Sequence, residues 1–309
     1  MKVIRAALPL LPFCQRVLPS RLTGLSVALL KATALEIAIL AGHLLLYPSG
    51  IVQERRPTPC GPSPLCDPSD PSALPGALNT AAAPTHLPTQ PKPPVVLLHG
   101  FIDNRSVFVL LRRSLAQHGR QQIESLNYSP LTCDIRTAAE LLGRHVEEIC
   151  ERTGHPRVDI VGHSLGGLIA RYYVQRLGGD LRVRTLVTLG TPHSGTRVVP
   201  LADAHPIVRQ MRPGSAVIEE LRLPAPDCRT RFVSFWSDLD HLMDPPETAR
   251  VDHPDLLAEN VQVSGVGHLA LPVHPAVATG IRQALDESDH SLTAVSQTDK
   301  ARAGGLTVA

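Results

Sequence analysis

The sequence predicts a doubly wound α/β fold, in which helices cover both faces of a mostly parallel sheet. Three nearly unbroken apolar runs, at residues 95–98, 158–161 and 185–189, are typical of parallel strands that are buried on both faces. Segments with helical periodicity stand between these runs, and alternation of strand and helix is the pattern of α/β proteins. We therefore expect one domain at residues 95–285, whose roughly 190 residues are enough to bury a single core.

A well-marked helix is expected between the first two of these strands. Asp134 is placed to cap the helix at its start, and Gly154 is placed to end it. Its apolar residues recur at the spacing of one helix face: Ile135, Ala138, Ala139, Leu142, Val146, Ile149 and Cys150. Cys150 is therefore expected to be an unreactive thiol in the core.

The later elements follow the same alternation. Residues 165–177 are expected to form a helix directly after the second strand, and residues 231–236 and 260–264 are expected to be the last two strands. The insertion at 196–227 mixes apolar residues with scattered charges. Two interpretations of it are open: amphipathic helices that act as a lid, or ordinary helices that cover the sheet.

The composition changes outside the predicted domain. Residues 1–24 carry basic and no acidic side chains, and residues 25–47 are mainly apolar. Residues 48–94 are rich in proline, which disfavours both helix and central strand, and residues 286–309 are small and polar. We expect a disordered tether at 48–94 and a disordered tail at 286–309.

The apolar segment at 25–47 is about long enough to span a bilayer as a helix. Lys31, Glu36 and His43 interrupt it, and Glu36 would cost about 2–3 kcal/mol if it were charged at mid-span. Three interpretations stay open: a signal-anchor, a long signal peptide, and a helix packed on the domain. We favour the anchor because basic residues precede the segment, so the expected location is the cell membrane, with the domain outside, or secretion.

Charge and cysteine spacing argue against some classes of function. The chain has 30 basic and 28 acidic residues, and so balanced a charge argues against nucleic acid as the main partner. The six cysteines do not show the spacing of a metal site. Cys60 and Cys66 lie in the proline-rich segment, where a small disulfide loop is an option if the segment is exported.

The most informative motif is Gly162-His163-Ser164-Leu165-Gly166, which lies where a predicted strand passes into a predicted helix. A serine between glycines at such a turn is held out at the sheet edge, where a base can reach its hydroxyl. The glycines are needed because the turn is too tight for a Cβ and because the helix starts close against the strand. Ser164 is therefore the candidate nucleophile.

A serine nucleophile needs a base and an acid that orients the base. His268 follows the last predicted strand, and the glycines just before it let the loop bring an imidazole back over the strand ends. His268 is therefore the candidate base. The acid is expected after the penultimate strand, where Asp238, Asp240 and Asp244 lie. We prefer Asp240 and keep Asp238 in reserve.

The developing oxyanion needs two backbone N–H groups. One is expected from Leu165, directly after the candidate nucleophile at the start of its helix. The other is expected from Phe101, in the loop His99-Gly100-Phe101 that follows the first strand. His99 is expected to brace this loop through hydrogen bonds and not to act as the base.

Several motifs together resemble the bacterial α/β-hydrolase lipases and esterases, and most of all the compact triacylglycerol lipases. These motifs are Val95–Phe101, Gly162–Gly167, Gly190–Gly195 and Gly265–His268. In that family the acid lies in a Ser-aromatic-Ser-x-x-Asp segment, and Ser234–Asp240 resembles it, which favours Asp240. The order Ser164, Asp240, His268 is also the order of this fold family.

The resemblance implies a serine hydrolase that cleaves carboxylic esters through an acyl-enzyme, with acylglycerols or related lipid esters as substrates. This chemistry requires no cofactor and no metal. The expected partners are the ester substrate and, through the apolar segment, a membrane; the oligomeric state stays open. Two alternatives remain: an acyltransferase that passes the same acyl group to another acceptor, and a non-catalytic scaffold tethered to the membrane.

Overall fold

The computed structural model describes residues 30–31, 33–42, 45–46, 48, 92–101, 103–128, 134–198 and 205–287. The predicted basic segment at 1–24, nearly all of the proline-rich segment and the tail from residue 288 onward lie outside these residues, as do Cys60 and Cys66.

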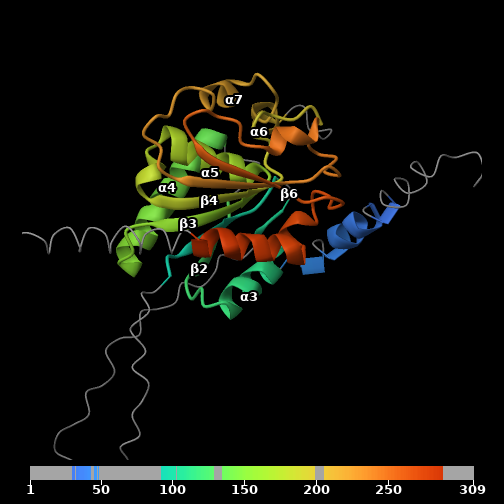
Figure 1. The fold of residues 1–309 in the computed structure, drawn as a ribbon, viewed down its shortest axis with the longest axis horizontal. Helices are drawn as coiled ribbons and strands as arrows, with labels where there is room; N and C mark the ends of the chain where they lie inside the picture. The colour runs from blue at the N-terminus through green and yellow to red at the C-terminus, as the bar shows by residue number, and fades with distance from the viewer. Residues whose placement is uncertain are drawn as a thin grey trace, which may run out of the picture.

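A six-stranded sheet with the order β2-β1-β3-β4-β5-β6 forms the centre of the domain (Figure 1). Its strands are β1 (Val95–Leu98), β2 (Ile123–Leu126), β3 (Val158–His163), β4 (Val183–Leu189), β5 (Arg231–Trp236) and β6 (Leu257–Gln262). Every neighbouring pair is parallel. The chain builds the sheet from β1 first to one side and then to the other, which is the doubly wound arrangement that the sequence predicts.

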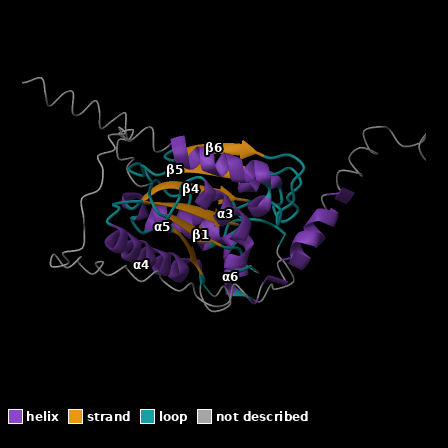
Figure 2. Cartoon of the chain, turned by 90° about the horizontal axis from the view of Figure 1, so that it is seen from below, coloured by secondary structure: helices purple, strands orange, loops and turns teal. Residues whose placement is uncertain are grey.

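Helices cover both faces of the sheet (Figures 1 and 2). On one face α4 (Ile135–Thr153) and α5 (Leu165–Arg176) share an apolar cluster with alternate strand residues. On the other face α3 (Val109–Gln117) and the helix at residues 275–287 share a second cluster. Because successive residues of β1 belong alternately to the two clusters, the strand is buried on both faces.

Short 3-10 helices complete the loops: η1 (Arg105–Phe108), η2 (Gly179–Leu181), η3 (Pro246–Ala249) and η4 (Leu271–Val273). The expected ends of α4 are confirmed. The side chain of Asp134 accepts a hydrogen bond from the Thr137 backbone N–H at 2.7 Å. Gly154 ends the helix with a φ of 72°, a left-handed conformation that glycine adopts without strain.

The two edge strands of the sheet, β6 and β2, differ most from the sequence-based prediction. The last strand is predicted at 260–264 but lies at Leu257–Gln262, because the pairing with β5 sets Arg231 opposite Leu257 and Trp236 opposite Gln262. The side chains at 257–259 are exposed, so the apolar pattern there is too weak to mark a strand. The edge strand β2, which carries polar residues, was not predicted for the same reason.

The insertion at 196–227 contains α6 (Pro206–Gln210) and α7 (Ala216–Glu220). Its buried apolar side chains join the cluster that holds α4 and α5: Ile207, Val208, Met211, Val217, Ile218 and Leu221. Glu220 pairs with Arg136 of α4 and accepts a hydrogen bond from the Tyr172 hydroxyl of α5 at 2.6 Å. The described part of the insertion thus packs as a cover over the helical layer, while residues 199–204 lie outside the described residues.

Part of the predicted apolar segment is helical and contacts the domain. Residues 33–42, called here the N-terminal helix, lie beside the loop between β6 and the final helix. No helix among the described residues has both the length and the hydropathy to cross a bilayer. This contact corresponds to the third interpretation, a helix packed on the domain. If the segment spanned a membrane instead, the hydrogen bonds between this helix and the domain would be broken. The location of the protein stays a prediction.

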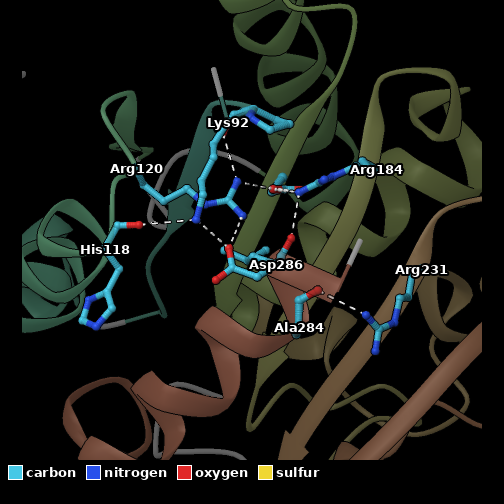
Figure 3. A network of polar contacts seen from close by, with 10 residues as sticks. Lys92, His118, Arg120, Arg184, Arg231, Ala284 and Asp286 are labelled. Atoms are coloured by element: carbon cyan, nitrogen blue, oxygen red, sulfur yellow. Dashed lines mark hydrogen bonds and ion pairs between the residues drawn. The ribbon is translucent and has the colours of Figure 1, made fainter. Parts of the chain in front are cut away.

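A network of ion pairs joins the amino ends of the strands to both ends of the domain (Figure 3). Asp159 of β3 is fully buried and is bound by Arg184 Nε at 2.9 Å and by Arg120 at 3.2 Å. Arg120 also binds Asp286 at 3.1 Å, and Asp286 binds Lys92 at 2.9 Å. Residues just outside the expected limits of 95 and 285 are therefore fastened to the sheet, and the final helix continues through residue 287.

Replacing Asp159 with alanine should destabilise the protein strongly, because two buried guanidinium groups would lose their shared carboxylate. We expect a loss of about 3–5 kcal/mol in the free energy of unfolding, measured in urea. The control is Glu147→Ala, which breaks a more exposed pair with Arg182 and should cost about 1 kcal/mol or less. A loss of less than about 1 kcal/mol for Asp159→Ala would contradict this account.

Candidate active site

Ser164 lies in a strained turn between β3 and α5. Its φ of 52° is the only positive value of a non-glycine residue within the described chain. A Cβ on Gly162 would come within 2.5 Å of Gly167 Cα, and a Cβ on Gly166 would overlap the carbonyl oxygen of Leu98. These close approaches require glycine, as the sequence predicts, and they hold the serine at the carboxyl edge of the sheet.

Neighbouring strands hold the backbone of this turn in place. The Ser164 N–H donates to the carbonyl oxygen of Leu189, the last residue of β4, at 2.9 Å. The Ser164 carbonyl oxygen accepts a hydrogen bond from the Thr191 hydroxyl at 3.0 Å. The end of β4 and the loop that follows it thus bind both the N–H and the carbonyl group of Ser164 and stabilise its strained conformation.

His268 and Asp240 form a buried pair at the same edge. The distance from His268 Nδ1 to Asp240 Oδ2 is 2.8 Å, and the two residues are 5% and 1% exposed. The other carboxylate oxygen accepts a hydrogen bond from the Leu242 N–H at 3.0 Å, so the orientation of the carboxylate is fixed. The structure thus brings together the acid and the base preferred from the sequence.

The charge of His268 is governed by burial and by nearby carboxylates. Burial alone lowers the pKa of His268, but Asp240, with smaller contributions from Asp103 and Glu36, more than offsets it. The resulting pKa lies above the ordinary value of 6.5. The imidazole therefore accepts a proton more readily, because Asp240 stabilises its charged form.

Asp238, the reserve candidate for the acid, has a different environment. It is exposed, and its carboxylate accepts a hydrogen bond from the Gly265 N–H at 3.0 Å. Asp244 is also exposed, and its backbone N–H donates to the Thr196 hydroxyl. Asp238 therefore shapes the turn before His268, while Asp240 holds the imidazole.

Gly190 allows the end of β4 to lie against the Asp240–His268 pair. A Cβ at this position, which has a φ of 52°, would lie 2.7 Å from Asp240 Oδ2 and 3.0 Å from His268 Nδ1. The preceding residue, Leu189, binds the Ser164 N–H. Adjacent residues at the end of β4 therefore contact Ser164 on one side and the Asp240–His268 pair on the other. The motif Gly190–Gly195 signalled this loop, but the sequence did not reveal the role of its first glycine.

His163 makes a second connection between the serine and the histidine. Its ring centroid lies 4.8 Å from that of His268, and its Nε2 lies 3.2 Å from the His268 carbonyl oxygen. Because His163 directly precedes Ser164, this contact ties the turn to the His268 loop. The candidate nucleophile, base and acid thus gather at one edge of the sheet.

The segments that carry the two candidate oxyanion donors lie beside the nucleophile. Leu165 is fully buried and begins α5, so its N–H belongs to the first turn of a helix, where N–H groups have no partner within the helix. A Cβ on Gly100 would lie 3.4 Å from Ser164 Cβ, so the loop that leads to Phe101 runs past the serine. Both loops expected to supply donors therefore lie beside Ser164.

His99 braces the loop after β1. Its Nδ1 lies 2.9 Å from the Gly100 carbonyl oxygen, and its own carbonyl oxygen accepts a hydrogen bond from the Tyr128 hydroxyl. The two rings stack with centroids 4.4 Å apart. Burial lowers the pKa of His99 below its ordinary value. The residue therefore holds the loop as a buried imidazole, in the way expected from the sequence.

Within the described chain, no group of three His, Cys, Asp or Glu side chains is arranged to hold a metal ion. Cys150 is buried in α4, and burial raises the pKa of its thiol. It occupies the unreactive core position expected from the helical pattern.

The chain is similar in sequence to one fold family and to several bacterial lipases. A model of the family described as alpha/beta hydrolase fold matches residues 93–222. A triacylglycerol lipase from Pseudarthrobacter phenanthrenivorans is 32% identical over 111 residues, which are 33% of this chain and 34% of that protein. A triacylglycerol lipase from Vibrio cholerae is 31% identical over 142 residues, 43% of this chain and 41% of that protein. The match thus spans less than half the length of these relatives.

Solved structures share the fold at low sequence identity. Lipase B from Aspergillus fumigatus superimposes with a TM-score of 0.55 and 17% identity, covering 73% of this chain and 62% of that one. Lipase BlEst2 from Bacillus licheniformis, in its propeptide form, gives a TM-score of 0.52 and 18% identity, covering 62% of this chain and 49% of that one. Together with the parallel sheet, these similarities establish the α/β-hydrolase fold.

Replacing Asp240 with asparagine should lower the pKa of His268 to below 6.5, because burial would remain while the main stabilising charge is lost. The measurement is an NMR titration of the histidine rings, with Asp238→Asn as the control that should move the pKa less. In the wild type, the raised pKa of His268 contributes to the free energy of unfolding. This contribution is fully present below about pH 6.5, the pKa of an unfolded histidine, and is lost as the pH rises through the pKa of His268 in the folded protein. An unchanged or higher pKa in Asp240→Asn would contradict the pairing.

Proposed function

We propose that this protein, whose fold is that of the α/β-hydrolases, is a serine hydrolase that cleaves carboxylic esters, with acylglycerols or related lipid esters as substrates. The observation that carries the proposal is the buried 2.8 Å hydrogen bond between His268 and Asp240 at the sheet edge that bears Ser164. The similarity to bacterial triacylglycerol lipases supports the choice of substrate class.

In the proposed reaction Ser164 attacks the ester carbonyl while His268 Nε2 takes the proton of its hydroxyl. The attack forms a bond between Ser164 Oγ and the carbonyl carbon. Asp240 accepts the hydrogen bond from His268 Nδ1 and stabilises the imidazolium that results. His268 then gives the proton to the leaving alcohol, and an acyl-enzyme remains.

Water completes the cycle by the same route. His268 takes a proton from a water molecule, the hydroxide adds to the acyl carbonyl, and the acid leaves as the proton returns to Ser164. In both steps the negative charge on the carbonyl oxygen needs donors that are already in place. The backbone N–H groups of Leu165 and Phe101 are proposed for that role, since Leu165 directly follows the serine and the loop that leads to Phe101 passes beside it.

The nucleophile can be tested with a fluorophosphonate probe, which reacts with activated serines whatever ester the enzyme prefers. We expect the wild type to be labelled at Ser164 and to hydrolyse nitrophenyl butyrate. Ser164→Ala should lose labelling and lower turnover by about 10,000-fold or more. Ser194→Ala, at the same sheet edge, should keep both. A folded wild type that remains unlabelled at Ser164 would overturn the proposal.

The acid can be tested by a matched pair of aspartate variants. Asp240→Asn should lower kcat by roughly 1,000- to 10,000-fold, because an asparagine cannot stabilise the imidazolium. Asp238→Asn should keep kcat within about threefold, because it alters a turn at the surface. Steady-state rates with nitrophenyl butyrate measure both. The reverse result would move the acid to Asp238.

A further inference from the structure

A carboxylate from the N-terminal helix binds the loop that carries His268. Glu36 Oε2 accepts a hydrogen bond from the Leu269 N–H at 3.1 Å, and Oε1 accepts one from the Ala270 N–H at 3.0 Å. These are the two peptide groups that directly follow His268. A residue more than 230 positions earlier in the chain thus holds the backbone next to the candidate base.

Gly267, just before His268, leaves room for this contact. A Cβ on Gly267 would overlap the Glu36 carboxylate. Its φ is not among the positive values, so the backbone conformation itself would allow a side chain. Gly265, with a φ of 78°, is the glycine that the turn requires. Gly267 therefore leaves the space that the carboxylate occupies.

The N-terminal helix uses one face for this contact. Ile39, one turn after Glu36, packs against the second apolar cluster, the one that contains α3 and the final helix. This cluster also includes Val266, Ala270 and Leu271 of the His268 loop. Ile37 points away and is 63% exposed. The part of the helix that touches the domain is thus directed at the His268 loop.

We propose that Glu36 is a positioning residue for His268, so that catalysis depends on the docked N-terminal helix. The inference rests on the proposed function, because it assigns His268 the role of base. Asp240 fixes the imidazole ring, and Glu36 fixes the peptide groups that follow it. With both contacts in place, neither the ring nor the backbone of His268 is free to turn away from Ser164.

The charge of Glu36 gives the proposal a measurable signature. The charged groups that face His268 are the carboxylates of Asp240, Asp103 and Glu36, and the ring of His163 packs against it. All three carboxylates favour the imidazolium. Removing the charge of Glu36 should therefore lower the pKa of His268, whereas a loss of packing on the N-terminal helix far from the loop should leave it unchanged.

The first experiment compares Glu36→Gln with Ile37→Gln, which places the same side chain on the exposed face. The second-order rate of Ser164 labelling by the fluorophosphonate probe is measured against pH in the full-length protein, and the pKa of His268 is measured by NMR. For Glu36→Gln we expect the plateau of the labelling rate to fall roughly 10-fold. We also expect the pKa of His268, and with it the acid limb of the profile, to move down by about half a pH unit. Ile37→Gln should match the wild type.

The second experiment is a double-mutant cycle with Gly267→Ala. In the wild-type background the added methyl group should displace the Glu36 carboxylate and lower the labelling rate roughly 10-fold. In a Glu36→Ala background the space is empty, so Gly267→Ala should cost less than about twofold. A smaller cost of Gly267→Ala in the Glu36→Ala background than in the wild type is expected only if Gly267 and the Glu36 side chain are in contact.

The outcomes separate this inference from the proposed function. A wild type that is not labelled at Ser164 overturns the enzyme proposal, while the NMR titration still reports whether Glu36 acts on His268. A labelled wild type with an unchanged His268 pKa and labelling rate in Glu36→Gln overturns the positioning role alone. Equal costs of Gly267→Ala in both backgrounds would also overturn it.

Discussion

The buried hydrogen bond between His268 and Asp240 is the interaction on which the proposed chemistry depends. A carboxylate and an imidazole are costly to bury singly, but each lowers the cost of the other when they are 2.8 Å apart. The second oxygen of Asp240 is held by the Leu242 N–H, so the pair has one orientation. That orientation is possible only because Gly190 has no side chain where the two groups meet. The acid, the base and this glycine therefore form a single unit.

The residues at the amino ends and at the carboxyl ends of the parallel strands have different roles. At the amino ends of the strands, Asp159 and its buried arginines fasten the start and the end of the domain to the sheet. At the carboxyl ends, the backbone of Ser164 is held in a strained conformation by the end of β4. Strain at one edge persists because the surrounding structure is fixed. Since parallel strands all end at the same edge, residues far apart in the sequence meet there.

The sequence predicted those features that local chemistry determines. β1 and β5 were predicted residue by residue, since β1 is a continuous apolar run and β5 carries large apolar residues on both sides of Ser234. Ser164 was marked by glycines that the turn needs. The exposed edge strand β6 was misplaced because pairing, and not hydropathy, sets its limits. The role of Glu36 could not be predicted either. In the sequence it is only a charged residue within an apolar segment, where it makes insertion into a membrane less favourable. Its hydrogen bonds to the His268 loop become visible only once the helix is placed against the domain.

The proposed mechanism requires that Ser164, the Asp240–His268 pair and two backbone donors act on one substrate carbonyl. A crystal structure of the protein after reaction with a phosphonate ester tests this most directly. We expect a covalent bond between Ser164 Oγ and phosphorus, with His268 Nε2 facing Ser164 Oγ. The phosphonyl oxygen should lie within hydrogen-bond distance of the Leu165 and Phe101 N–H groups. An adduct on another residue, or a phosphonyl oxygen directed away from both N–H groups, would contradict it.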